Sequence, residues 1–410
     1  MTVVRDAGLG HVLRSPRFGY FWLAQAISRF GDPITIIALA AASYRLTGSA
    51  LFTSLAVLIA TVPQATFGFF AGAIADAVGH RRAMVVCDLL RAFVIALIPI
   101  ALALGAPLAV PYGLVLVAAL CSATFNTARL AIVPALVPGE RLAASNSFIF
   151  ATDRSVEIAG ALAAGVLVAT IGDAAFWLDA LTFAVSAALL ARIALEEPAP
   201  RSVSWRSMSR DALAGLRFLR SSEVLFSYTV FSLVAQLSIP VLNGLLPVLL
   251  FRHFAGGDIA LGAQQFGLAE AALAAGAVGA GLVLSPVLDR VRKGRLVVAG
   301  FALFGAALVL VAFTTAFELL VVLMVLIGVT NVLFYAPNVA IAQEQTPPGL
   351  RARVFGARAA LLNLTWLPFV LVGGALGDVV AVPLLIGAAG VLTLGAAAVA
   401  LATRALPDVR

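Results

Sequence analysis

Charged residues and the residues of catalytic chemistry are scarce in this chain. Only 11% of its 410 residues are charged, whereas an ordinary soluble domain carries about 25%. Three histidines, two cysteines and the lack of an H-E-x-x-H sequence predict no metal or haem centre. The sequence also lacks the G-x-x-x-x-G-K-S/T phosphate loop, which argues against ATP-driven pumping. We therefore expect neither an enzyme nor a bound cofactor.

Apolar residues, in contrast, are abundant. They make up 62% of the chain, and the mean hydropathy is +1.06. A water-soluble globule cannot bury so much apolar surface, and a membrane core accepts helices because they satisfy their own backbone hydrogen bonds. Twelve helices of about 22 residues would use about 264 residues. We predict an all-α integral membrane protein with twelve transmembrane helices, at 18–42, 52–75, 83–104, 109–133, 143–170, 174–195, 223–251, 262–288, 295–316, 318–343, 353–377 and 382–403.

The basic residues fall in clusters between the apolar runs. Lysine and arginine total 27 against 20 acids, a small excess that does not indicate a nucleic-acid partner. If both termini lie in the cytoplasm, only Arg45 and Arg252 fall in outer connections. Such an asymmetry is what the positive-inside rule requires. We therefore predict a multi-pass protein with both ends inside, in contact with membrane lipid.

Two halves of similar size flank the one long polar stretch, residues 196–222. Part of that stretch, 205–219, could form an amphipathic helix on the inner membrane face. The run 125–132 and the proline that follows it recur as 334–341 and a second proline at the same spacing, and 72–82 corresponds to 285–293. These correspondences indicate a duplicated six-helix unit, as in secondary transporters. We predict bundles at 1–195 and 223–410, joined by a linker at 196–222.

The connection after the second span carries a motif of a transporter family. A glycine, two small or aliphatic residues, an aspartate, a glycine and two bases follow one another as Gly72, Ile74, Ala75, Asp76, Gly79, Arg81 and Arg82. This motif resembles the loop 2–3 signature of the major facilitator superfamily, from which Ala77 and His80 depart. The segments 21–32, 88–91, 134–146, 176–183 and 351–356 further resemble the branch of macrolide-efflux and enterobactin-exporter proteins.

The resemblance implies a major facilitator fold, with two pseudo-symmetric six-helix bundles that alternate between inward-open and outward-open states. It also implies a monomeric transporter of small molecules in the bacterial inner membrane. In that superfamily the motif latches the inner gate, where Asp76 would lie near the start of span eleven. Asp88 and Arg91 are spaced as an ion pair near the inner edge of span three, which favours a fixed structural pair. The expected gate residues are Gly72, Asp76, Gly79, Arg81, Arg82, Asp88, Arg91 and Asp289.

Ionisable residues inside the spans are the candidates for energy coupling. Each costs at least about 2.5–3.5 kcal/mol at a helix centre, so each needs a partner or a water-filled cavity. Asp32 and Glu157 each lie three residues from an arginine, and Asp153 lies one turn before Glu157. We predict that Asp32 is the main carboxylate that exchanges protons, and that Glu157 is the second, with Asp153 beside it. The alternative is that these acids form fixed ion pairs that hold the helices together.

Polar and aromatic residues within the spans are candidates for a cargo site. Gln236 and Asn243 share a face of the seventh span, which Pro240 and Gly244 are expected to interrupt at mid-depth. The arginines beside the buried acids could instead bind an anionic group of the cargo. The full candidate set is Arg29, Phe30, Arg154, Gln236, Asn243, Glu270, Asn331 and Trp366.

These features favour a secondary active transporter that exports an amphipathic drug or a secondary metabolite against entering protons. Two alternatives stay open on the sequence. A lysolipid or siderophore transporter would use Arg29 or Arg154 to hold an anionic group. A non-transporting membrane scaffold or sensor would keep the fold without the coupling.

Overall fold

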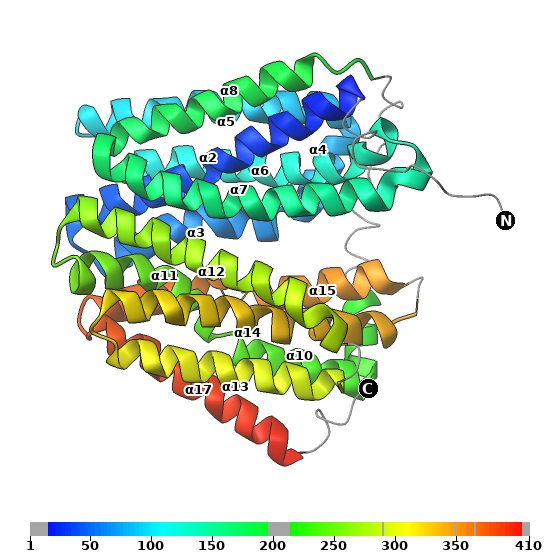
Figure 1. Ribbon diagram of the computed structural model, residues 1–410, viewed down its shortest axis with the longest axis vertical. Helices are drawn as coiled ribbons and strands as arrows, with labels where there is room; N and C mark the ends of the chain where they lie inside the picture. Colours follow the sequence, from blue (N-terminus) through cyan, green and yellow to red (C-terminus); the bar gives the residue numbers. More distant parts are fainter. Residues whose placement is uncertain (1–14, 196–213, 289–290, 348–349, 365, 404–410) are drawn as a thin grey trace. The chain divides into compact units, whose positions relative to one another are not determined.

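The regular elements of the protein are helices throughout the described part of the chain. The computed structural model describes residues 15–195, 214–288, 291–347, 350–364 and 366–403, and it has no strand within them (Figure 1). The predicted all-α class is confirmed.

Contacts between Cα atoms divide the chain into two compact units. The first holds Met1–Ala42 and Ile59–Val203, and the second holds Ser43–Leu58 and Ser204–Arg410. The second unit therefore includes residues 52–58 of the second expected span. The predicted division at 195 and 222 stays a prediction. Most of the expected amphipathic helix 205–219 lies outside the described residues, and residues 214–221 are helical.

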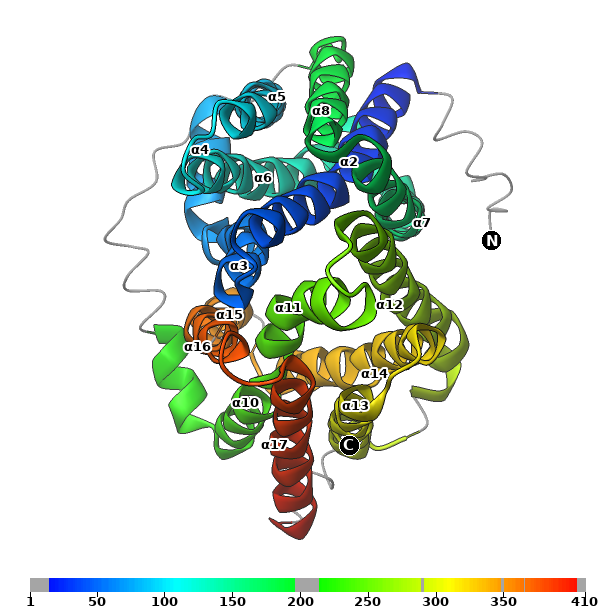
Figure 2. The ribbon, with the colours of Figure 1, turned by 90° about the vertical axis from the view of Figure 1, so that its left-hand side faces the viewer.

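In the first unit, α5 (His80–Ala103) packs against two other long helices. α5 lies beside α6 and α8 (Figures 1 and 2). Phe18, Phe21, Met84 and Phe125 are among the buried core residues of this unit. Its elements, of which α2 and α3 also reach into the second unit, are α2 (Pro16–Thr47), α3 (Ala50–Thr66), α4 (Gly68–Val78), α5 (His80–Ala103), α6 (Ala109–Leu136), η1 (Gly139–Arg141), α7 (Leu142–Ile171), η2 (Gly172–Ala174) and α8 (Ala175–Ala191).

The second unit packs its helices closely through glycines. α12 (Ile259–Leu288) packs against α14 (Phe317–Glu344), and a Cβ atom added at Gly276 or Gly328 would overlap backbone atoms of the facing helix. Such small residues let helix backbones approach each other in a membrane. The remaining elements are α10 (Glu223–Ala235), α11 (Ser238–Val248), η3 (Leu249–Phe254), α12 (Ile259–Leu288), α13 (Lys293–Phe313), α14 (Phe317–Glu344), α15 (Arg351–Leu364), α16 (Trp366–Gly377) and α17 (Val382–Thr403).

The expected seventh span is interrupted, but not at the predicted place. α10 ends at Ala235 and α11 begins at Ser238, so the turn lies at Gln236 and Leu237. Pro240 sits in the first turn of α11, where its missing N–H leaves no helix bond unmade. Gly244 lies inside α11. The prediction of an interruption at Pro240 and Gly244 is therefore wrong by several residues, because a proline is best accommodated just after a break rather than at it.

Nine helical runs of the described residues are long and apolar enough to cross a membrane. The run Gly139–Ala191 counts once although it contains both α7 and α8. α3 contributes only the shorter apolar helix Ala50–Thr61, and Arg29 and Asp32 lower the hydropathy of α2. The integral-membrane class is confirmed, whereas the count of twelve spans stays a prediction.

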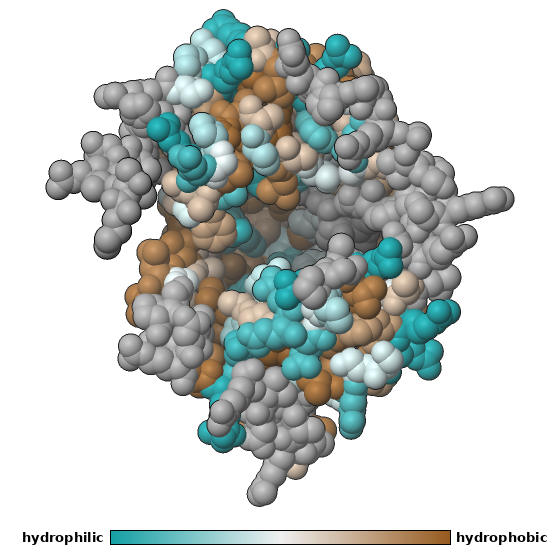
Figure 3. Space-filling view, turned by 90° about the vertical axis from the view of Figure 1, so that its right-hand side faces the viewer, coloured by the Kyte–Doolittle hydropathy of each residue, from teal (hydrophilic) through white to brown (hydrophobic). Residues whose placement is uncertain are grey.

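The outward faces of these helices are apolar, as lipid contact requires. Phe93 on α5 is 62% exposed, and Phe313 at the end of α13 is 78% exposed. Figure 3 shows such hydrophobic side chains (brown) at the surface, with hydrophilic ones (teal) gathered beside them. Exposed apolar area on this scale marks a surface that another apolar phase covers.

An aspartate from the end of α16 holds the start of α3 within the second unit. The Asp378 carboxylate accepts hydrogen bonds from the Ser49 hydroxyl at 2.7 Å and from the Ala50 N–H at 2.6 Å. A third bond comes from the Leu51 N–H at 3.3 Å. These N–H groups belong to the first turn of α3 and have no partner within that helix. Asp378 therefore caps α3 from a residue more than 300 positions away in sequence.

Arg252 in η3 reinforces this cap. Its guanidinium lies 3.7 Å from the Asp378 carboxylate. It also donates to the carbonyl oxygens of Gly377 and Gly48, each at 2.8 Å. We call Ser49, Ala50, Arg252 and Asp378 the α3 clasp.

Candidate functional site

Asp32 lies in the middle of α2 between two arginines of the first unit. Its carboxylate is 4.0 Å from Arg29, one turn earlier on α2, and 3.7 Å from Arg91 on α5. Pro33 follows it, and a proline removes the helix bond that would reach the carbonyl of residue 29. The Asp32 side chain is 28% exposed. This acid therefore combines flanking positive charge with access to water.

Arg91 is the centre of the buried charge on α5. It forms an ion pair with Asp88, one turn earlier, and the Ser186 hydroxyl of α8 donates to the same carboxylate at 2.5 Å. The side chains of Asp88 and Arg91 are 0% and 2% exposed. The prediction placed this pair near the inner edge of the membrane, where desolvation is slight. The expectation of slight desolvation is wrong, because both side chains are completely buried in protein. The depth of the pair in the membrane stays a prediction.

The rest of the Arg91 guanidinium is also enclosed. It donates to the hydroxyls of Ser122 at 3.1 Å and Ser28 at 3.3 Å. It lies over the rings of Phe125 and Phe183, 4.7 and 4.1 Å from their centroids. Cation–π contacts of this kind strengthen when water is excluded. Arg91 is therefore held rigidly toward Asp32.

Asp179 on α8 completes this group, and the sequence analysis did not select it. Its side chain is completely buried, and its Oδ2 accepts a 2.5 Å hydrogen bond from the Thr35 hydroxyl of α2. Thr182 on the same helix donates to Oδ1 at 3.2 Å. Asp179 stands as a single acid in the apolar run of the sixth expected span. That isolation was the signal available in the sequence.

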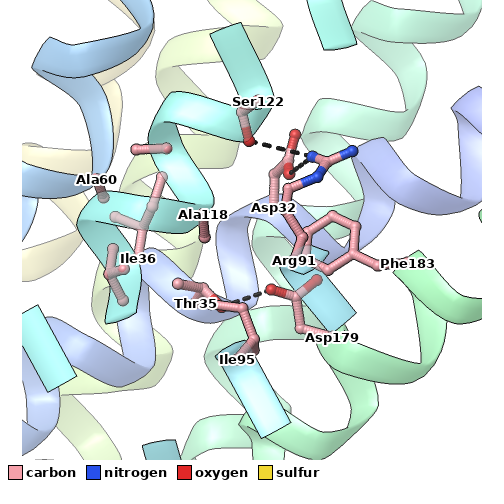
Figure 4. A pocket seen from close by; sticks show the side chains of 12 residues that line it. Asp32, Thr35, Ile36, Ala60, Arg91, Ile95, Ala118, Ser122, Asp179 and Phe183 are labelled. Atoms are coloured by element: carbon pink, nitrogen blue, oxygen red, sulfur yellow. Dashed lines mark hydrogen bonds and ion pairs between the residues drawn. The ribbon is translucent and has the colours of Figure 1, made fainter. Parts of the chain in front are cut away.

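Asp32 and Asp179 line the same small hollow (Figure 4). The apolar part of its lining comes from α2, α3, α5, α6 and α8, and the polar part is Asp32, Thr35, Arg91, Ser122 and Asp179. Its volume of about 40 Å³ holds a few waters, since one water needs roughly 10–15 Å³ on this measure. Drug-sized ligands need pockets of about 300–1,000 Å³. The hollow is therefore suited to water and protons rather than to a large cargo.

Asp153 and Arg129 form a second ion pair in the same unit. Arg129 on α6 lies 2.7 Å from the Asp153 carboxylate on α7, and Gln25 on α2 donates to Asp153 at 3.0 Å. Arg29 donates to Asn126 at 2.8 Å. The structure thus joins Asp153 to Arg129, a base that the sequence analysis passed over.

Glu157 lies apart from this buried group. It pairs with Arg154 at 2.6 Å, at the spacing noted in the sequence, and their side chains are 49% and 41% exposed. Arg154 also lies over the ring of Phe150, 5.4 Å from its centroid. Phe30 is half-buried, and its carbonyl faces Gly160, where a Cβ would lie 2.8 Å from that oxygen.

Several of the residues predicted for the inner gate lie at the junction of α4 and α5. Gly79 joins the two helices with φ of 95°, a conformation that favours glycine. Asp76 lies 3.8 Å from the ring nitrogen of His80. Arg81 donates to the carbonyl of Ala191, the last residue of α8, at 3.3 Å and to that of Ile193, just beyond it, at 2.6 Å.

Three further residues predicted for the gate are Gly72, Arg82 and Asp289. Gly72 lies within α4, and Arg82 is exposed at the start of α5. Asp289 lies outside the described residues. The proposed latch to span eleven stays a prediction.

The cargo candidates of the second unit are spread over five elements. Gln236 follows the last residue of α10 as its C-cap, Asn243 donates to the Ile239 carbonyl within α11 at 3.0 Å, and Glu270 is half-buried in α12. Asn331 is exposed on α14, and Trp366 begins α16. The structure does not assign them to one pocket among the described residues.

A buried polar cluster that the sequence analysis missed lies elsewhere in that unit. Arg358 on α15, 6% exposed, donates to Asn338 on α14 and to the Ser232 hydroxyl on α10. Asn338 in turn donates to Ser232 at 2.9 Å. In the internal repeat, Asn338 is four residues after Phe334, as Arg129 is after Phe125. The equivalent positions in the two halves, Arg129 and Asn338, thus each belong to a polar pair. In the first half both partners are charged, whereas in the second half a neutral amide pairs with Arg358.

Comparisons with known proteins agree with this architecture. A family profile described as transmembrane secretion effector matches residues 11–409. The chain is 27% identical over 362 residues to the multidrug efflux pump Tap of Mycolicibacterium fortuitum, covering 85% of this chain and 86% of that protein. It is 23% identical over 353 residues to macrolide efflux protein A of Streptococcus pyogenes, with the same two coverages.

Solved transporter structures share the fold. A bacterial homologue of the iron transporter ferroportin, in an inward-facing state, superposes with a TM-score of 0.73 at 16% identity, covering 96% of this chain and 99% of that one. The nucleoside transporter NupG gives a TM-score of 0.71 at 12% identity, covering 94% and 99%. With the membrane-spanning helices, the profile match shows that the chain belongs to the transmembrane secretion effector family of the major facilitator superfamily.

Proposed function

We propose that the protein exports amphipathic drugs or secondary metabolites in exchange for protons, by alternating access. The observation that carries this proposal is the buried carboxylate group around Asp32, which shares a water-sized hollow with Arg91. A carboxylate in a membrane span is costly and is retained where it serves a proton or ion pathway. The efflux names of the relatives Tap and macrolide efflux protein A support the direction and the class of cargo.

The cluster around Asp32 couples the transport, whereas the cargo binds elsewhere. The hollow is too small for a drug, so the cargo binds outside it. Gln236 and Asn243 of the second unit are the residues proposed to contact it. The motif from Gly72 to Arg82, with Asp289, forms the inner gate. The protein works as a monomer in the bacterial inner membrane, surrounded by lipid, with both termini in the cytoplasm.

The pairing of two arginines favours this proposal over an anionic cargo. Arg29 already contacts Asp32 and donates to Asn126, and Arg154 already pairs with Glu157. An anionic group would have to displace an internal carboxylate from either of them. A neutral or cationic amphipathic compound meets no such competition.

A growth-protection experiment tests the proposal. The gene is expressed in a bacterium that lacks its own drug pumps, which is challenged with erythromycin and with ethidium, with and without a protonophore. We expect protection that the protonophore removes, and loss of protection in Asp32→Asn. An Asp173→Asn variant, altered in the η2 turn outside the charged group, serves as the control and keeps the protection. Protection that persists in the protonophore contradicts proton coupling, and no protection by a correctly inserted protein contradicts export of these compounds.

A further inference from the structure

Asp179 differs from the other buried acids of the first unit in the chemistry of its partners. Asp88 pairs with Arg91, Asp153 pairs with Arg129, and Asp32 lies between two arginines. The contacts of Asp179 come from two hydroxyl groups, those of Thr35 and Thr182. No ion pair to Asp179 occurs among the residues that the structure describes.

The charges that surround Asp179 leave one acid in excess. Asp32 on α2 and Arg91 on α5 are the charges that act on Asp179 directly. Asp88 pairs with Arg91, and Arg29 lies beside Asp32. The Arg129–Asp153 pair of α6 and α7 completes the group, because both of its charges act on Asp32. Three arginines therefore balance three of the four aspartates. A net negative charge in a buried site is unfavourable, and one bound proton removes it. The four aspartates together therefore bind one proton, because the three arginines neutralise only three negative charges.

Thr35 and the hollow connect Asp179 to Asp32. Thr35 lies three residues after Asp32 on α2, and its hydroxyl reaches the Asp179 carboxylate (Figure 4). Both carboxylates line the hollow of about 40 Å³, which has room for a few bridging waters. A proton that enters this water can bind an oxygen of Asp179, and the Thr35 hydroxyl can rotate to donate to or accept from that oxygen.

Gly31 indicates that the position of Asp179 is specified closely. A Cβ atom at residue 31 would overlap the Asp179 carboxylate and the Thr182 hydroxyl. Glycine next to Asp32 thus provides the space that brings α8 against α2. The approach of the two acids depends on a residue that has no side chain.

We propose that Asp179 is the carboxylate that takes up and releases the coupled proton, while Asp32 stays ionised between Arg29 and Arg91. This inference rests on the proposed function and assigns its proton to one residue. In the outward-open state a proton from water binds an Asp179 oxygen, and in the inward-open state the same proton leaves to water. Asp32, Arg29 and Arg91 keep their charges throughout the cycle. Asp32 and Arg91 line the hollow together with Asp179.

The test uses everted membrane vesicles with an acidified lumen and labelled erythromycin or ethidium. Exchange of one proton without net charge gives about tenfold accumulation for each pH unit of the gradient. We expect Asp179→Asn to abolish this accumulation while it still exchanges labelled for unlabelled compound, at a rate that no longer depends on pH. Asp179→Glu restores part of the accumulation, and Asp173→Asn behaves as the wild type. A merely structural role for Asp179 would reduce exchange and accumulation together.

The outcomes separate the two proposals. If the wild-type protein accumulates neither compound, the proposed function is wrong. If the wild type accumulates one of them and Asp179→Asn does so equally well, with the same pH dependence, the assignment to Asp179 is overturned. Should Asp179→Asn fail to insert, Asp179→Glu and Thr35→Val decide, because both alter the proton site. A shifted pH profile of exchange in these two variants supports the assignment, and an unchanged profile in both overturns it.

Discussion

The Asp378 carboxylate accepts a 2.6 Å hydrogen bond from the Ala50 N–H and so caps α3 from the far end of α16. Burial acts to raise the pKa of this carboxyl, but three hydrogen bonds and the nearby Arg252 guanidinium outweigh burial and hold the pKa below its ordinary value. The ionised form is therefore the one that the fold stabilises.

We expect Asp378→Ala to destabilise the protein by about 1 kcal/mol at pH 7, the usual value of a lost helix cap. Because the pKa is lower in the folded state, the carboxylate contributes its full stabilisation above the unfolded pKa of about 3.9. That contribution is lost as the pH falls through the folded-state pKa. Thermal unfolding of purified protein in detergent, at pH 7 and at lower pH, measures the difference between wild type and variant. A difference that is as large at the lowest pH as at pH 7 contradicts the ionised cap.

The two i,i+3 ion pairs of the first unit should differ sharply in their contribution to stability. Asp88→Ala breaks the buried ion pair to Arg91 and leaves the Ser186 hydroxyl without its acceptor. Loss of one partner of a buried pair costs about 3–5 kcal/mol. We expect this loss for Asp88→Ala, since Arg91 is enclosed by protein. Glu157→Ala breaks an exposed pair with the same spacing and should change stability by at most about 1 kcal/mol. Denaturation of the two variants in the same detergent gives the comparison, and equal losses would show that burial is not the cause.

Gly31→Ala should disturb the proton site directly. The added methyl group overlaps Asp179 and Thr182, and overpacking of this kind costs about 1–3 kcal/mol. We expect lower thermal stability and reduced proton-driven accumulation. Gly113→Ala on α6 is the matched control, because nothing lies within 4 Å of its added Cβ. If both variants behave alike, the close approach of α2 and α8 does not depend on residue 31.

Asn338→Asp should stabilise the second unit. It would give the buried Arg358 a carboxylate in place of an amide, as Arg129 has in Asp153. Hydrogen bonds to charged groups contribute about 1.5–3 kcal/mol, so we expect a higher melting temperature. The reciprocal change, Asp153→Asn, should lower it. A lower melting temperature in Asn338→Asp would indicate that Arg358 already has its charge balanced.

Local hydropathy was sufficient to predict the uninterrupted helices. The expected spans 109–133 and 382–403 correspond closely to α6 and α17, because a membrane helix is defined by its own apolar run. The expected span 52–75 was not continuous, since α3 ends at Thr66 and α4 begins at Gly68. Pro63 precedes this break, but a proline inside an apolar run does not by itself predict at which residue the helix ends.

The candidate site was predictable only where its partners lie on one helix. The spacing of Arg29 and Asp32 predicted their approach, because residues three apart share a helix face. The contact of Asp179 with Thr35 depends on α8 packing against α2, and no local pattern encodes that. Arg129 and Asp153 likewise meet across two helices. Sequence reasoning thus found the acid at the centre of the group and missed the partners that tertiary packing supplies.

The α3 clasp has a consequence for how the protein is assembled during synthesis. Residues 43–58 leave the ribosome with the first half, yet their contacts belong to the unit formed by the second half. Asp378 is synthesised only after more than 300 further residues. The first turn of α3 therefore lacks its Asp378 cap during most of translation. Residues 43–58 reach their final contacts only after the last helices have entered the bilayer.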